Sequence, residues 1–122
     1  MSGPNLVARD FKIVRSDECA RSRQHRGVFT RVIHECAELQ ILRTEMEALS
    51  SCEHADLGHT PAYHFVVEGN PVFQAPSKSA QLMPGDSIIL SCNKPCAVVN
   101  SSTSRSVILS VLFKSLPKGT EP

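Results

Sequence analysis

The sequence predicts an all-β protein. Short runs rich in apolar and β-branched residues recur along the chain, and turn-forming residues separate them. The clearest turn signals are Gly69-Asn70 and Pro84-Gly85-Asp86. Many short strands separated by turns are typical of a β-sandwich or a β-barrel. We expect one exception, a short helix near the N-terminus.

The N-terminal third is expected to hold two strands and that helix. Residues 10–14 are a short strand candidate, and Ser16, Asp17 and Glu18 supply a cap and early acidic residues for a helix through about Arg23. Residues 27–34 then alternate and are rich in β-branched side chains, which predicts a strand.

The segment 36–49 has two readings. Leu39, Leu42, Met46 and Leu49 fall near helical spacing, and the residues between them are good helix formers. The alternation of residues 39–42 also suits a strand. Periodicity alone leaves strand and helix open for residues 37–49.

The second half of the chain is expected to contain only strands and turns. Residues 50–61 form a polar loop, 62–68 a strand, and the Gly69-Asn70 turn closes a hairpin with 71–74. The Pro84-Gly85 turn closes a second hairpin. Further strands are predicted at 87–90, 96–99 and 105–114, the last with Val107, Leu109, Val111 and Phe113 on one face.

Composition limits the classes of function. The 122 residues predict a single domain, 1–122, with loose termini at 1–9 and 117–122. The formal net charge is only +1, tryptophan is absent and aromatic residues make up 5%, which argues against nucleic-acid binding. Neither a signal peptide nor a membrane span is predicted. Five cysteines without a C-x-x-C pair predict free thiols and a cytoplasmic location.

Two sequence blocks resemble the conserved motifs of the cupin superfamily. The second cupin block has glycine, P-x-G, histidine and asparagine at fixed spacings, and these positions are here Gly85, Ser91, Asn93, Cys96 and Asn100. Residues 65–69 (FVVEG) match the end of the first block. The resemblance covers roughly residues 39–113 and implies an antiparallel jelly-roll barrel. It also favours a strand over about Leu39–Glu47, because fold context often overrides propensity.

The chain departs from this family at the metal ligands. The first block's two histidines and carboxylate correspond to Ala55, Leu57 and Ala62, which cannot bind a metal, and the second block's histidine is Cys96. The resemblance therefore implies the fold but not the family's metal site. Glu68 and Asp86 repeat the family's scaffold pattern, and we expect structural roles for both.

A rebuilt metal site is the alternative. His54, His59 and His64 lie at intervals of five, and with Cys96 and Glu53 they offer ligands for a divalent transition metal such as zinc, iron, nickel or copper. Such a centre would make the protein a metal-dependent enzyme: a dioxygenase, isomerase, decarboxylase or cyclase. The competing interpretation is that His64 is a hydrogen-bonded core residue and that the loop histidines are solvated.

The predicted binding site lies inside the barrel. His64 follows Ala62 by two residues, so it should face inward, together with Cys96 and with Asn100 at the end of the same strand. We expect these side chains to hold a small, largely apolar organic ligand, without a certain cofactor. A third hypothesis is a structural or regulatory module that dimerises. A homodimer is expected in any case, because bare edge strands promote aggregation.

Overall fold

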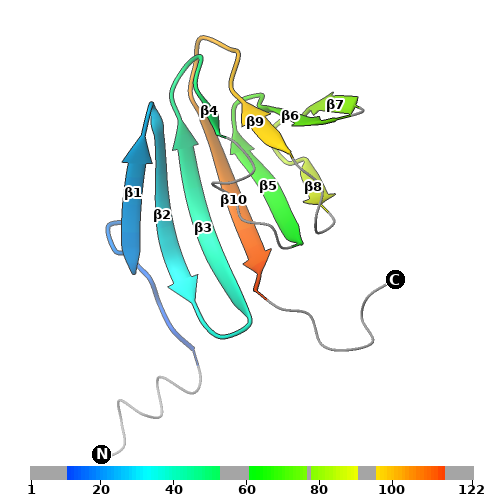
Figure 1. Cartoon of the computed structure of the whole chain (residues 1–122). Coiled ribbons are helices and arrows are strands. Elements are labelled where there is room, and N and C mark those ends of the chain that lie inside the picture. Colours follow the sequence, from blue (N-terminus) through cyan, green and yellow to red (C-terminus); the bar gives the residue numbers. More distant parts are fainter. Residues whose placement is uncertain (1–10, 53–60, 77, 91–95, 115–122) are drawn as a thin grey trace, which may run out of the picture.

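The computed structural model describes residues 11–52, 61–76, 78–90 and 96–114 of the 122. Every regular element in this part of the chain is a β-strand, and the strands form two antiparallel sheets (Figure 1). The six-stranded sheet has the order β1-β2-β3-β10-β5-β8: Arg21–His25, Val28–Glu35, Leu39–Met46, Ser106–Phe113, Ala62–Glu68 and Ser87–Leu90. The four-stranded sheet has the order β4-β9-β6-β7: Ser51–Cys52, Ala97–Val99, Val72–Ala75 and Lys78–Gln81. The predicted all-β architecture is confirmed.

The expected N-terminal helix was wrong. Residues 16 and 17 form a turn, and Arg21–His25 is strand β1, paired with β2 at the edge of the larger sheet. Glu18, one of the acidic residues expected near the start of the helix, instead stabilises this turn: its carboxylate accepts a hydrogen bond from the Arg15 backbone amide at 2.9 Å. The strand expected at residues 10–14 is likewise absent over 11–14.

The ambiguous segment at 36–49 is a strand, as the family resemblance implied. β3 lies between β2 and β10 and pairs with both along its length. Its inward side chains are Leu42, Thr44 and Met46, all buried. Pairing on both sides satisfies the backbone of β3, and this outweighs the helix propensity of its residues.

Neither predicted hairpin turn closes a hairpin. After Gly69 the chain leaves the six-stranded sheet and enters β6 of the smaller sheet, and after Gly85 it returns to the larger sheet as β8. β5 pairs with β8 instead. The Pro84–Asp86 turn contacts β5, because the Val66 amide donates a hydrogen bond to the Asp86 carbonyl oxygen at 2.9 Å. The hairpin in this region joins β6 to β7. A local turn signal does not determine which sheet receives the next strand.

The last strand, β10, is irregular at its start. A bulge in its pairing with β5 falls between Val107 and Ile108, and both of these side chains are buried. Leu109, Val111 and Phe113 share the outer face as predicted, whereas Val107 does not. The inward positions after the bulge are Ile108, Ser110 and Leu112.

Side chains of both sheets fill the space between them. The main cluster joins buried residues of the two sheets: Val28, Met46, Cys52, Phe73, Cys96, Val98 and Ile108. A second cluster, of Val32, Leu42, Ala62 and Leu112, belongs entirely to the larger sheet. Polar side chains on the inner face therefore have to find partners inside the barrel.

Candidate functional site

His64 lies in the barrel interior. It is on β5 between the inward residues Ala62 and Val66, and it is only 1% exposed. The strand period of two thus places the imidazole inside, as the sequence analysis expected. Its ring stacks at a tilt on Phe73 of the opposite sheet, with 5.3 Å between ring centroids.

One imidazole nitrogen has a hydrogen-bond partner and the other has none. His64 pairs with Ser110 across the β5–β10 ladder, and His64 Nδ1 lies 2.6 Å from Ser110 Oγ. Nε2 is buried and has no partner among the described residues. A buried polar atom left unpaired costs about 1–3 kcal/mol, so its retention in the core needs an explanation.

Burial also determines the charge of this group. Loss of solvation lowers the pKa of His64 from its ordinary value of 6.5 to about 4. The imidazole is therefore neutral at physiological pH. It can donate or accept a hydrogen bond there, but it does not provide a positive charge for an anion.

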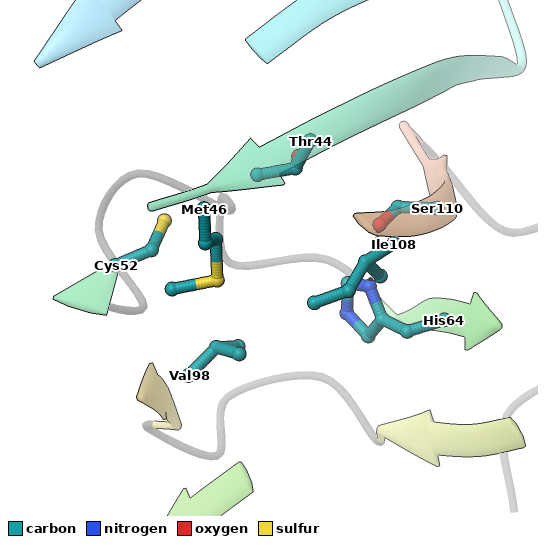
Figure 2. Close-up of a pocket in the computed structure, with 7 residues that line it drawn as sticks. All are labelled: Thr44, Met46, Cys52, His64, Val98, Ile108 and Ser110. Atoms are coloured by element: carbon teal, nitrogen blue, oxygen red, sulfur yellow. Dashed lines mark hydrogen bonds between the residues drawn. The ribbon is translucent and has the colours of Figure 1, made fainter. Parts of the chain in front are cut away.

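A small hollow lies beside the imidazole, between the two sheets. Figure 2 shows side chains of β3, β4, β5, β9 and β10 converging on it. We call this space the His64 hollow; its lining is Thr44, Met46, Cys52, His64, Val98, Ile108 and Ser110. The free volume of the hollow is about 10 Å³. This is roughly the space that one water molecule requires.

Six of the seven lining residues, all except His64, were not singled out from the sequence as site residues. Thr44 and Met46 lie on β3, whose conformation the sequence left open, and Cys52 lies within residues 50–61, which were expected to be a loop. Ser110 carried the only available signal. It is a polar residue within the apolar run 107–113, and on an inward face such a residue needs a partner.

Cys96 is buried in the main core cluster and does not line the His64 hollow. Its thiol lies 3.7 Å from the carbonyl oxygen of Ala97 and does not hydrogen-bond to His64. Burial raises the pKa of the Cys96 thiol, which keeps it protonated and unreactive. The sulfur-containing residues that line the hollow are Cys52 and Met46 instead (Figure 2).

Asn100 connects loops and strand ends. It is fully buried, and its Nδ2 donates to the carbonyl oxygens of Met46, Glu47 and Ser104 at 2.9–3.1 Å. Its Oδ1 accepts a hydrogen bond from the Ser102 hydroxyl at 2.9 Å. These contacts occupy the amide, and Asn100 is not among the residues that line the hollow.

Solved structures with the same architecture identify the fold. A predicted oxalate decarboxylase from Thermotoga maritima superposes with a TM-score of 0.71 at 16% identity, covering 84% of this chain and 98% of the other. A Cupin 2 conserved barrel domain protein from Salinispora arenicola also gives 0.71 at 16% identity, covering 86% and 90%. KdgF from Halomonas sp. gives 0.70 at 12% identity, covering 86% and 96%. The chain has the cupin fold. No protein-family model matches it, and no match was found among curated proteins.

At the aligned positions, the described residues do not match the metal ligands of the cupin superfamily, which the sequence resembles. The carboxylate position is Ala62, which is buried among apolar side chains, and the histidine position is the protonated Cys96. No group of three or more histidine, cysteine or acidic side chains suited to a metal occurs in the part that the structure describes. His54, His59 and Glu53, the other predicted ligands, lie outside it, as do the aligned positions Ala55 and Leu57.

The two acidic residues of the cupin blocks have structural contacts. The Asp86 carboxylate accepts a hydrogen bond from the Met83 amide at 2.8 Å, and Glu68 forms a two-pronged ion pair with Arg105, with both contacts at 3.3 Å. Both lie on the barrel exterior, away from the His64 hollow.

The described part of the chain contains no helix with the length and apolar character of a membrane span.

Proposed function

We propose that this cupin barrel binds a small organic molecule in the His64 hollow and does not use the metal chemistry of its family. One observation carries the proposal. His64 Nε2 is a buried polar atom without a partner, and it lies on a hollow between the sheets. A ligand atom bonded to Nε2 would offset the free energy that burying it unpaired requires.

The lining matches a largely apolar ligand. Met46, Val98 and Ile108 supply apolar surface, and Thr44, His64 and Ser110 supply a few polar groups for orientation. The space has the size of one water molecule, so a ligand of several atoms requires a side chain to move. Met46 is suited to this, because its unbranched side chain has three rotatable bonds and adapts its shape readily.

Thermal unfolding tests the proposal. A panel of small uncharged molecules should contain compounds that raise the melting temperature of the wild-type protein. The same compounds should have no such effect on the variant His64→Phe, which keeps an aromatic ring of similar size but has no nitrogen. A panel without effect on the wild type, or with equal effects on both proteins, would contradict the proposal.

We also propose that the outer face of the six-stranded sheet pairs with a second copy of the chain. Four apolar side chains are cross-strand neighbours on this face and form a row: Ile41, Val111, Tyr63 and Ile89. Ile89 is 78% exposed. Arg43, two residues from Ile41 on β3, pairs with Glu45 within the chain, so that a copy of the same surface meets little net charge beside the row.

The association state tests this pairing. Light scattering of the wild type should give twice the chain mass, and Ile89→Glu should shift it to the monomer. Met83→Glu is the control, because Met83 is also exposed but lies outside the row. A monomeric wild type, or an Ile89→Glu variant that remains dimeric, would overturn this second proposal.

A further inference from the structure

We infer that His64 presents an N–H donor to the His64 hollow, and that the ligand there is an uncharged hydrogen-bond acceptor such as a carbonyl compound. The inference rests on the proposed function, because it names the class of ligand for the same hollow. It follows from how the Ser110 hydroxyl can be satisfied.

Ser110 determines which imidazole nitrogen carries the proton. Its side chain is buried, and within the described residues its hydroxyl has one hydrogen-bond partner, His64 Nδ1. A hydroxyl has one hydrogen to donate. If Nδ1 carried the proton, Ser110 Oγ would accept it and the hydroxyl hydrogen would have no acceptor. If Ser110 donates to Nδ1, the hydroxyl is satisfied and the proton of the neutral ring is on Nε2.

The lining of the hollow determines the charge of the ligand. None of its seven residues is an acid, a lysine or an arginine. A carboxylate or an ammonium group would therefore be buried without a partner of opposite charge, which is far more costly than burying a neutral polar group. A neutral molecule with an acceptor oxygen satisfies Nε2 without that penalty.

The same hydrogen bond disfavours metal ligation by His64. A metal ion requires the lone pair of Nε2, and a ligating histidine ordinarily donates its other N–H to a carboxylate, a backbone carbonyl or water. Here, moving the proton to Nδ1 would leave the buried Ser110 hydroxyl without an acceptor. Ser110 thus favours a donor at Nε2 over a metal ligand.

Nuclear magnetic resonance of the full chain tests the tautomer. Long-range ¹H–¹⁵N correlation spectra of histidine-labelled protein at neutral pH distinguish the two tautomers, and loss of signals in His64→Phe assigns those of His64. We expect the pattern of a neutral ring protonated at Nε2. In Ser110→Ala the fixed pattern should give way to a mixture of tautomers. A ring protonated at Nδ1 in the wild type would overturn the inference.

Formamide and formate, matched in shape and different in charge, test the ligand class. Titration with formamide should shift the His64 Nε2 signal, with a response at least ~10-fold larger than that to formate, because burial penalises the anion. Equal responses to the two would overturn the uncharged ligand class. A shift by formamide in a ring protonated at Nδ1 would leave the proposed function standing and reject the inference. A ring protonated at Nε2 that responds to neither probe would instead reject the proposed binding in the hollow.

Discussion

The two faces of the six-stranded sheet have opposite chemistries, although they alternate residue by residue on the same strands. The inner face carries a few short polar groups among apolar side chains, and each must be satisfied within the barrel. The outer face carries ion pairs beside an exposed apolar row. On the outer face solvent satisfies any polar group. Among the described residues of the inner face, the unpartnered Nε2 of His64 is therefore informative, whereas a comparable group outside would not be.

Neighbouring residues of β10 provide the largest expected difference between the faces. Ile108 is 3% exposed and belongs to the main core cluster, whereas Leu109 is 36% exposed. Ile108→Ala should lower the free energy of unfolding by about 3 kcal/mol, because it leaves a cavity that the core cannot fill. Leu109→Ala should cost less than about 1 kcal/mol in the monomer. Urea unfolding measures both, and equal losses would show that the bulge has been assigned to the wrong position.

The two glycines at which the chain changes sheets, Gly69 and Gly85, differ in how closely other atoms surround them. At Gly69 (φ 87°) an added Cβ would overlap Ser106 Oγ and lie 2.7 Å from the Arg105 carbonyl oxygen, whereas at Gly85 (φ 95°) it would meet nothing within 4 Å. Gly69→Ala should therefore cost about 3 kcal/mol or more, by strain and overlap together. Gly85→Ala should cost only about 1 kcal/mol, from its positive φ alone. Thermal unfolding of the two variants would contradict this account if Gly85→Ala were the more damaging.

Acid should weaken the inner face through His64. The pKa of this group is about 4 in the folded protein and 6.5 unfolded, so the unfolded chain binds the proton more tightly. The stability contributed by neutral His64 is complete above pH 6.5 and is lost as the pH falls toward 4. The loss amounts to about 3 kcal/mol from the size of the shift. The His64→Phe variant should lack this component, and the difference between the two unfolding curves against pH isolates it from the carboxylates. Parallel curves would show that His64 does not titrate with folding.

The smallest effects on the free energy of unfolding are expected at two buried serines of β10, Ser106 and Ser110, which form a matched pair of variants. Ser110 Oγ is bonded to His64, whereas Ser106 Oγ has no partner in the described part of the chain. Ser110→Ala should cost about 1–2 kcal/mol, because it leaves both imidazole nitrogens unpaired. Ser106→Ala should be neutral or slightly stabilising, because it removes an unsatisfied hydroxyl. Calorimetric unfolding that ranks them in the reverse order would remove the special role of Ser110.

Local patterns predicted the strands but not their partners. The spans 62–68 and 27–34 were recovered because alternation and β-branched content indicate a strand directly. The turn at Gly69-Asn70 was recognised, but its hairpin was wrong because the destination sheet is decided by tertiary packing. A helix was expected from Ser16 through about Arg23 because of the cap signal at its start, but Arg21–His25 pairs with β2 as a strand, and this pairing overrides the signal.

The sequence predicted only part of the candidate site. The strand period placed His64 inside the barrel, yet it could not show that Ser110, 46 residues later, is its partner across the sheet. Cys96 and Asn100 were chosen by alignment with the cupin motif, whereas the structure places one in the apolar core and the other in a network of backbone contacts. Both outcomes depend on contacts between distant strands, which no spacing in the sequence records.

The most direct measurement of the central claim is a crystal structure of the protein soaked in formamide, compared with an unsoaked crystal. We expect density for one small molecule in the His64 hollow, with its oxygen within hydrogen-bond distance of His64 Nε2 and with Met46 displaced where room is needed. Nε2 bonded to a protein group, or a hollow filled by Met46 in both crystals, would contradict the claim that this barrel holds a ligand at His64.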